Sequence, residues 1–590
     1  MRSLASQVLV LFFLLLVGQQ STRAAELFIQ GYTNGCFDCI TPADNGAPQA
    51  AQLIGLTYFN SAFGGTTSNG GLLLTSAATA PATHNNNNLG SFQLNAQPAS
   101  YGTHSFKLLV RFTSPEGIGS GHPVVLSGVV SGTITSTGTG SVVINFDNAP
   151  VALSYNDPNC EGDPATTCGS GQIFLRVDDL NLSPGQSRAL AGRVTNVQPA
   201  AAGQVIISEF RMGGPAGTCD KFVELYNNTD ATLSVLGYGV FFGNPNGSSA
   251  IGGPLNSAGT IQPRGHLLVT TGSYSLGSYA SPNVTLGTCA NVENAAVGLF
   301  SSSLSQANRV DSVTFSDVPQ NSGVQFSFGE GAPLPQTGPS TAEHSWIRAF
   351  VNGRPQDTSN NAADFILIST TGGALGGVQA RLGAPGPENL ASPVERNGAL
   401  IIAQLDPAQC STCAPNRSRD TSVYTDTLTN PSTPATFNNG RLMIRRTYTN
   451  ATGSPITRLR FRITDITTLN SPGYSLGGAQ ADLRAITSPD ENINMTSGET
   501  VLVRGLRLED PARGVERGGL NASLAADFVT TSAPATEGDD TAAFGAPSVS
   551  GDTINLAAPL QPGQSISVQF WLGVVQPGRF RFLVNFEALP

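Results

Sequence analysis

The densest cluster of acidic and amide side chains is the stretch GRPQDTSNNAADF at residues 353–365. Asp357, Ser359 and Asn361 fall at positions one, three and five, the spacing at which an EF-hand loop places oxygen ligands for calcium. Such a loop also requires a glycine at position six and a glutamate at position twelve, where this sequence has alanine and isoleucine. The match to a calcium loop is therefore partial.

Two explanations of this cluster stay open. A calcium ion would take Asp357, Asn361 and Asp364 as ligands, because hard cations prefer carboxylate and amide oxygens. Alternatively, Asp, Asn and Thr side chains hydrogen-bond to their own backbone in tight turns, which explains the composition without an ion. We favour a capped turn that leads into the strand-like segment DFILIST at 364–370. No metal site is predicted here.

A second cluster with chemical potential is a row of arginines in RLRFRI at residues 458–463. Because side chains alternate between the faces of a strand, Arg458, Arg460 and Arg462 share one face. Aligned guanidinium groups bind carboxylates and phosphates, so these residues are candidate contacts for an anionic polysaccharide, a phosphate-rich polymer or an acidic protein patch. The alternative is an arginine ladder that is neutralised by acids on neighbouring strands.

The sequence contains no catalytic motif that its context supports. GYSLG at 473–477 matches the nucleophile elbow G-x-S-x-G, but the last histidine, His344, precedes it, and no helical pattern follows. The histidines are scattered, and phosphate-binding and dinucleotide-binding loops are absent. Glycosidase carboxylates come from distant strands, so no such pair can be named. No catalytic residue and no cofactor are predicted, which favours a protein that is not an enzyme.

The cysteines predict disulfide bonds. Eight cysteines form three close pairs and one wider pair. An even number in an exported chain is typical of a disulfide framework. The alternative, a zinc or redox site, needs two C-x-x-C motifs closer together or a C-x-x-C motif beside a βαβ unit. The predicted pairs are Cys36/Cys39, Cys160/Cys168, Cys219/Cys289 and Cys410/Cys413.

The N-terminus predicts export. Arg2 is followed by an apolar run from Val8 to Val17, and Thr22-Arg23-Ala24 is an acceptable cleavage site, which together indicate a signal peptide at residues 1–24. No later stretch has the roughly 18 apolar residues of a membrane-spanning helix. We therefore expect a mature chain that is secreted, extracellular or held at the cell surface.

The composition predicts an all-β protein. Charged residues make up only 12% of the chain, which holds 67 glycines and 38 prolines, and strand-like runs recur between turn residues. The net charge of −10 argues against general affinity for nucleic acids, because phosphate binding requires a basic face. The expected strands are SFKLLVRF (105–112), SVVINF (141–146), QIFLRV (172–177), QVIISEF (204–210), KFVELY (221–226), HLLVTT (266–271) and DFILIST (364–370).

Two flexible joints divide the chain. QPAAAG at 198–203 is rich in small residues, and GAPGPENLASPVERN at 383–397 is rich in proline, glycine and charge. These joints predict three regions after the signal peptide, each with β-sandwich character. Their expected bounds are 25–200, 203–390 and 398–590.

The middle region carries short phrases that occur together in one family. They are Ile207-Ser208-Glu209-Phe210, FVELYN (222–227), Gly237-Tyr238, IQPRGHLLV (261–269), RVDSVTF (309–315), SWIRA (345–349) and GAPGPENL (383–390). In this combination, residues 203–390 resemble a lamin tail domain of the kind found in secreted bacterial proteins. Lys221 departs from the pattern, because relatives more often carry an acid there.

The resemblance implies an immunoglobulin-like β-sandwich that serves binding or structural support, without catalytic residues to transfer. In FVELYN, Val223 and Leu225 share the face that we assign to the core. Glu224 then lies on the other face, where we expect a surface carboxylate near an arginine; a ligand-binding carboxylate is the alternative.

The sequence as a whole favours an exported, non-enzymatic binding or structural protein. Its partner would be an envelope or extracellular polysaccharide or a protein. Two alternatives stay open: a secreted hydrolase of the glycosidase or esterase class, and an accessory carbohydrate-binding protein.

Overall fold

A computed structural model describes residues 26–589 except 78–85, 103, 158–168, 246–249, 288, 290–294, 339, 470, 472–477, 510–517, 529–554 and 557. The all-β prediction is confirmed, because the described residues form many antiparallel sheets. Each of the expected strand segments lies in or overlaps a strand. In chain order these strands are β8 (His104–Ser114), β10 (Gly140–Phe146), β12 (Gly169–Val177), β16 (Val205–Arg211), β17 (Phe222–Asn227), β22 (His266–Thr271) and β29 (Phe365–Ser369).

Helices contribute little to this fold. The α-helices of the described residues are α1 (Gly323–Phe328) and α2 (Asn361–Asp364), each shorter than two turns. Neither approaches the length and apolar character that a membrane span requires.

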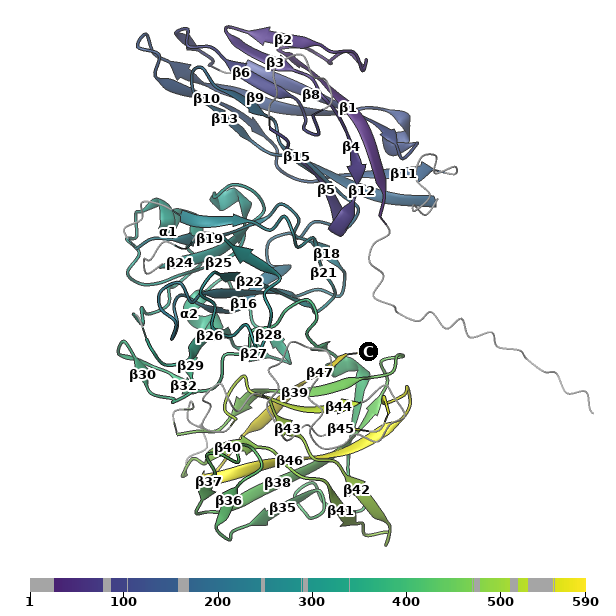
Figure 1. The fold of residues 1–590 in the computed structure, drawn as a ribbon, viewed down its shortest axis with the longest axis vertical. Coiled ribbons are helices and arrows are strands. Elements are labelled where there is room, and N and C mark those ends of the chain that lie inside the picture. The colour runs from purple at the N-terminus through teal and green to yellow at the C-terminus, as the bar shows by residue number, and fades with distance from the viewer. Residues whose placement is uncertain are drawn as a thin grey trace, which may run out of the picture.

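The first group of sheets, at the top of Figure 1, is built around aromatic side chains. Phe106 of β8 lies 4.9 Å from Tyr58 and 5.0 Å from Phe92 between ring centroids, and all three are fully enclosed. The seven-stranded sheet adds β1 (Phe28–Phe37), β4 (Ala62–Thr66), β7 (Ala99–Ser100), β9 (Val124–Ile134) and β13 (Leu180–Leu182) to β8 and β10. Two four-stranded sheets contain β2 (Ala50–Leu53), β3 (Leu56–Phe59), β5 (Gly71–Leu74), β6 (Ser91–Leu94), β11 (Val151–Asp157), β14 (Ser187–Ala189) and β15 (Gly192–Thr195), together with β12.

The middle group is a sandwich of two sheets, shown in teal in Figure 1. The seven-stranded sheet has the order β23-β22-β17-β16-β26-β29-β32, and the facing sheet has the order β20-β19-β24-β25. Further bounds are β19 (Gly239–Gly243), β20 (Ala250–Pro254), β23 (Val284–Leu286), β24 (Ala296–Phe300), β25 (Arg309–Thr314), β26 (His344–Arg348) and β32 (Arg381–Leu382). Val223 and Leu225 of β17 lie in the core between the sheets, as the period of two predicts.

The third group, in green and yellow in Figure 1, contains two larger sheets around a separate core. One sheet has the order β33-β47-β39-β44-β43 with β45 paired to β44, and the other has the order β34-β38-β46-β40 with β35 paired to β38. The bounds are β33 (Val394–Glu395), β34 (Leu400–Gln404), β35 (Arg417–Asp420), β38 (Arg441–Asn450), β39 (Arg458–Ile466), β40 (Asp482–Ile486), β43 (Arg507–Leu508), β44 (Ser523–Phe528), β45 (Asn555–Leu556), β46 (Ser565–Gln576) and β47 (Phe582–Leu589).

Short two-stranded ribbons project from these groups. They are β18 (Leu233–Ser234) with β21 (Thr260–Ile261), β27 (Phe350–Val351) with β28 (Arg354–Pro355), β30 (Ala374–Leu375) with β31 (Val378–Gln379), β36 (Tyr424–Asp426) with β37 (Ala435–Phe437), and β41 (Glu491–Asn494) with β42 (Thr500–Val503).

Polar contacts join neighbouring groups. Between the first and second, Arg176 donates to Asn308 Oδ1 at 3.0 Å. Between the second and third, the backbone N–H of Ala384 donates to Leu520 O at 3.1 Å. The bounds 25–200, 203–390 and 398–590 stay a prediction about which segments fold as independent domains.

Three of the predicted cysteine pairs are disulfides in the structure: Cys36–Cys39, Cys219–Cys289 and Cys410–Cys413. Cys160 and Cys168 lie outside the described residues, as do the signal-peptide residues 1–24 and the GYSLG motif.

The Cys219–Cys289 bond is expected to stabilise the chain more than Cys410–Cys413. It links residues 70 apart, whereas the other links residues 3 apart, and a disulfide that closes a longer loop removes more conformational entropy from the unfolded chain. Replacing Cys219 and Cys289 by serine should cost about 2 to 3 kcal/mol more than the same change at Cys410 and Cys413. Urea unfolding of the two double variants measures the difference, and equal costs would contradict the expectation.

Candidate functional site

A row of polar side chains crosses one face of the seven-stranded sheet of the sandwich. A β-bulge at Ser208 shifts the register of β16 on β17, so that Glu209 lies directly opposite Glu224. On the next strand, β22, His266 is the diagonal neighbour of Glu224. Like charges directly opposite each other are unfavourable, so this pair of carboxylates needs compensating partners.

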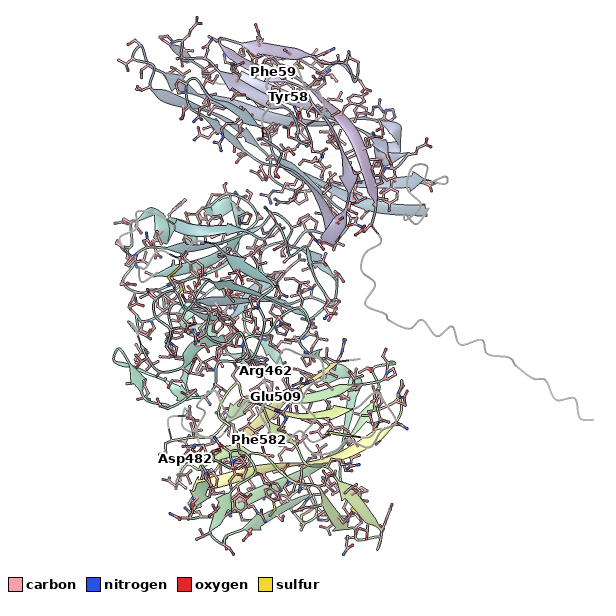
Figure 2. All side chains as sticks on the ribbon, viewed as in Figure 1. Tyr58, Phe59, Arg462, Asp482, Glu509 and Phe582 are labelled. Atoms are coloured by element: carbon pink, nitrogen blue, oxygen red, sulfur yellow. A yellow bond between two sulfur atoms is a disulfide. The ribbon has the colours of Figure 1, made fainter. Side chains whose placement is uncertain are left out.

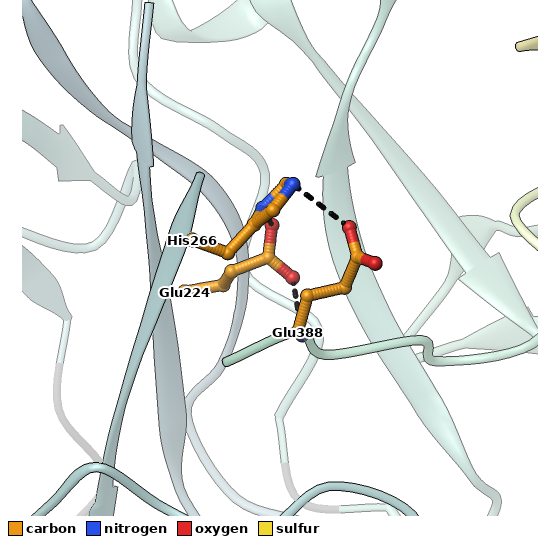
Figure 3. Close-up of side chains that lie close together, drawn as sticks. All are labelled: Glu224, His266 and Glu388. Carbon is orange, nitrogen blue, oxygen red and sulfur yellow. Dashed lines mark hydrogen bonds and ion pairs between the residues drawn. The ribbon is translucent and has the colours of Figure 1, made fainter. Parts of the chain in front are cut away.

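Glu224, His266 and Glu388 form the centre of this row (Figure 3). Nδ1 of His266 lies 2.9 Å from Glu224 Oε1, and Nε2 lies 3.0 Å from Glu388 Oε2. The backbone N–H of Glu388 donates to Glu224 Oε2 at 2.7 Å. All three residues are buried.

These three side chains offer ligand atoms within 4.8 Å of one another, so a metal ion must be considered. A metal-binding histidine turns one nitrogen to the ion and uses the other as a hydrogen-bond donor. Here each ring nitrogen faces a different carboxylate, and Glu388 also contacts Arg462 Nη2 at 2.7 Å. The arrangement fits a histidine that bridges two glutamates, rather than a metal ligand.

Arginines of the C-terminal sheets complete the network from the opposite side. Arg460 and Arg462 of β39 contact Glu587 of β47, with Nε–Oε distances of 2.6 Å and 3.0 Å, and both also contact Glu388. Arg462 Nη1 donates to Asn521 Oδ1 at 2.7 Å. Figure 2 shows Arg462 where the teal sandwich meets the C-terminal sheets. We call this set of Glu209, Glu224, His266, Glu388, Arg460, Arg462, Asn521 and Glu587 the junction network.

The carboxylates of the junction network differ in proton affinity. Burial, together with the neighbouring charge of Glu224, raises the pKa of Glu209 to about 7. Glu209 also accepts hydrogen bonds from Ser345 Oγ at 2.6 Å and from Gly386 N at 3.0 Å, and these bonds act to lower its pKa. Asn521 Nδ2 donates to the same carboxylate at 3.0 Å. Burial also acts to raise the pKa of Glu587, but Arg460 and Arg462 outweigh it and hold that pKa below its usual value.

The cavity beside the junction network is small. Its volume is about 20 Å³, and its walls include Glu209, Glu224, His266 and Arg462. That volume holds about one water molecule. The network therefore has the dimensions of a structural junction and not of a substrate site.

The structure places the predicted arginine row in this junction. Arg460 and Arg462 are buried and paired with Glu388 and Glu587, and Arg458 contacts Glu509. This is the alternative of an arginine ladder neutralised by acids. Contact of Arg460 or Arg462 with an external anion stays a prediction, which would require the displacement of these glutamates.

The expectation that Glu224 is a surface carboxylate is wrong. The side chain lies on the face opposite Val223 and Leu225, as the alternation predicts, but it is buried. The segment that contains Gly386 and Glu388 lies across this face, where Gly386 N donates to Glu209 Oε1 and Glu388 N to Glu224 Oε2. Glu209 and Glu224 are therefore buried by residues that lie more than 150 positions away in the chain.

The weak calcium candidates lie in a capped turn. Asp364 Oδ1 accepts from Thr358 Oγ1 at 2.7 Å, and its Oδ2 lies 3.3 Å from Arg348 Nη1. Asn361 donates to Ser312 O, and Asp357 lies 3.5 Å from Arg348. All three side chains thus contact other groups of the protein, which favours a capped turn over a calcium site.

A separate pocket of about 220 Å³ lies in the sandwich beside β26. Met212, Phe315 and Trp346 give it an apolar wall, and His344 adds a polar one. Two loops complete it: residues 212–218, and residues 336–338 together with 340 and 341. The strand β26 separates this pocket from the junction network, because Ser345 contacts Glu209 on one face while His344 and Trp346 point to the other.

Sequence reasoning missed most of these residues. His266, Glu388 and Glu587 are far apart in the chain and have no motif spacing, and the pocket residues of β26 look like an ordinary strand. A paired-strand alignment would have placed His266 beside Glu224, but nothing local points to Glu388.

Comparisons with known proteins cover a part of the chain. Residues 198–317 match the family model described as Lamin Tail Domain. Among solved structures, a DUF4876 family protein from Bacteroides thetaiotaomicron is similar at 12% identity over 43% of this chain and 84% of that chain, with a TM-score of 0.21. No curated protein matches. The resemblance to a lamin tail domain is thus confirmed for residues 198–317, which form an immunoglobulin-like part of an all-β chain.

Proposed function

We propose that this chain is an exported, non-enzymatic binding and structural protein, in which the lamin-tail-like sandwich is an interaction module supported by the C-terminal sheets. One observation carries the proposal. The two faces of β26 have different surroundings. On one face, Ser345 contacts the junction network, and on the other, His344 and Trp346 line a pocket.

The junction network supports the structural half of this proposal. A hydrogen bond from Asn521 to Glu209, and ion pairs from Arg460 and Arg462 to Glu388, join the sandwich to the C-terminal sheets, and the cavity between these residues is only about 20 Å³. Buried, multiply bonded charges have little freedom to move, so the two parts are held in one orientation.

The same network weighs against the hydrolase alternative at this place. A glycosidase needs two carboxyl groups that flank a sugar-sized space. Glu209, Glu224 and Glu388 are instead buried and engaged by protein donors, next to a cavity of about 20 Å³.

Export is the first part of the proposal to test. In a host that secretes proteins, the full chain should be found outside the cytoplasm, and mass spectrometry should give a mature N-terminus at Ala25. Replacing Leu14 and Leu15 by arginine interrupts the apolar run of the signal sequence and should leave the chain uncleaved inside the cell. Cytoplasmic recovery of an uncleaved wild-type chain would overturn the export proposal.

Binding is tested by retention of the mature chain on envelope fractions and secreted polysaccharide of the source organism. We expect retention by the wild-type chain and weaker retention by Ser340→Phe, which adds a ring to the lining of the pocket. Arg354→Ala, a change at a half-exposed side chain away from the pocket, is the matched control. Hydrolysis of the polysaccharide, or no retention on any fraction, would contradict the proposed function.

A further inference from the structure

We infer that the pocket beside β26 binds a small, uncharged aromatic ring that carries one hydroxyl or N–H group, of the phenol class. This inference deepens the proposed binding function, because it assigns a ligand chemistry to the interaction module. The ring could belong to a free small molecule or to a tyrosine side chain, and the test below separates these sources.

The size and lining of the pocket select a single ring. A volume of about 220 Å³ is below the roughly 300 to 1,000 Å³ of pockets for larger ligands. Met212, Phe315 and Trp346 supply sulfur and aromatic surfaces, and the Phe315 and Trp346 rings meet edge to face with centroids 6.1 Å apart. Aromatic ligands gain from such edge and face contacts in addition to the burial of apolar area.

Two polar atoms of pocket-lining side chains, one on His344 and one on Trp346, call for a ligand with hydrogen-bonding capacity. Nδ1 of His344 lies 2.8 Å from Ala342 O, and because a carbonyl oxygen only accepts, Nδ1 carries the proton. Burial lowers the pKa of His344, so the ring is neutral and its Nε2 is an acceptor. Among the described residues, neither Nε2 of His344 nor Nε1–H of Trp346 has a hydrogen-bond partner.

Both of these side chains are almost enclosed, with exposed fractions of 4% for His344 and 5% for Trp346. They stand two residues apart on the same face of β26 and line the pocket. In the proposed complex, the ligand meets one acceptor, His344 Nε2, and one donor, Trp346 Nε1–H, on a mostly apolar wall. A hydroxyl group can donate to the first and accept from the second, whereas a methyl group or a halogen leaves them unsatisfied.

The wall formed by residues 212–218 is held in place before any ligand binds. Arg211 and Asp220 form an ion pair at the base of this loop, and Asp220 Oδ2 accepts from Ala216 N at 3.1 Å. Lys221 Nζ donates to Met212 O at 2.6 Å. A Cβ at Gly214 would lie 2.6 Å from both Arg211 Cζ and Asp220 Oδ2, so only glycine lets the loop pack this closely. A preorganised wall lowers the entropic cost of binding.

The charges near the pocket favour an uncharged ligand. Arg211 is already paired with Asp220 and Glu343 behind the loop, and His344 is neutral. A charged ring substituent would therefore lose its hydration without gaining an ionic partner.

Tryptophan fluorescence gives a direct test, because the chain has two tryptophans and only Trp346 lines the pocket. Trp571→Phe leaves Trp346 as the single reporter and keeps an aromatic ring next to Tyr424 and Arg441. In this background, p-cresol should change the Trp346 emission with a Kd of about 0.1 to 1 mM, as expected for a ligand of this size. The isosteric p-fluorotoluene, in which fluorine replaces the hydroxyl, should bind about five to ten times more weakly.

The variant side of the test uses His344→Phe, which keeps a ring and removes both nitrogens. It should weaken p-cresol by about five to ten times and leave p-fluorotoluene nearly unchanged. The ligand pair tests the wild-type pocket even if that variant does not fold. The tripeptide Gly-Tyr-Gly separates the sources: binding like p-cresol indicates a tyrosine side chain, and no binding indicates a free phenol.

Two results would overturn the inference: no response of Trp346 to millimolar p-cresol, or equal affinities for p-cresol and p-fluorotoluene in the wild-type pocket. The outcome is distinguishable from that of the proposed function, because export and retention on envelope fractions are measured without any phenol. A chain that is exported and retained but ignores p-cresol keeps its proposed function and loses this ligand class.

Discussion

Replacement of Arg462 by alanine is expected to lower the free energy of unfolding by about 3 to 5 kcal/mol. The guanidinium is buried and contacts Glu388 Oε2 at 2.7 Å, Glu587 Oε1 at 3.0 Å and Asn521 Oδ1 at 2.7 Å. Its removal leaves two buried carboxylates short of a positive partner. Removing one member of a buried ion pair costs far more than the pair contributes, because the remaining charge stays desolvated.

Urea unfolding measures this cost, with tryptophan fluorescence as the signal. Trp346 reports on the sandwich and Trp571 on the C-terminal sheets, so the experiment also shows whether both parts lose stability. Arg354→Ala is the control, because Arg354 is half exposed and lies 4.0 Å from an exposed Asp230. Such a surface pair contributes about 0 to 1 kcal/mol. Similar losses for the two variants would show that the junction network does not hold the two parts together.

The second large effect concerns pH: the free energy of unfolding should fall as pH rises from about 5 to about 8. Burial raises the pKa of Glu209 to about 7, and burial together with Asp311 raises the pKa of Glu330 to about 8. Between the unfolded pKa, near 4.3, and these folded values, the native chain holds protons that the unfolded chain has released. The proton-linked stabilisation therefore decreases as pH rises through this window, by about 3 kcal/mol for Glu209 alone.

Groups with lowered pKa values set the opposite slope in acid. Glu587 and Asp364 have folded pKa values below their usual range, so the stability that they contribute is present above the unfolded pKa and is lost as pH falls. The two slopes together place maximal stability near pH 4 to 5, below the range common for proteins.

Urea titrations at a series of pH values test this profile. Glu209→Gln and Glu330→Gln should each flatten the decline between pH 5 and 8, whatever their effect on absolute stability. Glu116→Gln, a change at an exposed side chain for which no such burial exists, should keep the wild-type slope. A wild-type stability that increases from pH 5 to 8 would contradict the prediction.

Much of the fold could be predicted from the sequence because strand formation depends on local patterns of apolar and polar residues. QVIISEF and HLLVTT became β16 and β22, since alternating or fully apolar runs between turn residues have few other ways to bury their side chains. Cys219 and Cys289 could be paired because the other six cysteines form three close pairs, which leaves these two. The lamin tail resemblance was recognisable because phrases such as FVELYN and Gly237-Tyr238 lie in a strand and a turn that are close together in the chain.

The alternation also placed Glu224 on the correct face, and Arg458, Arg460 and Arg462 on one face of β39. The solvent exposure of such a face does not follow from the alternation, because it depends on which other segments pack against the face. The segment around Glu388 packs over Glu224. The same segment and Glu587 pack against Arg462.

By itself, the sequence determined the strands, the facing of their side chains, three of the cysteine pairs and the lamin tail resemblance of the middle segment, because these follow from the period of two and from short spacings. Only the tertiary structure decided that the acidic row of the sandwich and the arginine row of the C-terminal sheet meet, and that β26 has a closed junction on one face and a pocket on the other. The physical reason is that burial and ion pairing arise between surfaces whose residues are far apart in the chain, 74 positions for Glu388 and Arg462 and 312 for Glu209 and Asn521. No local pattern encodes that encounter.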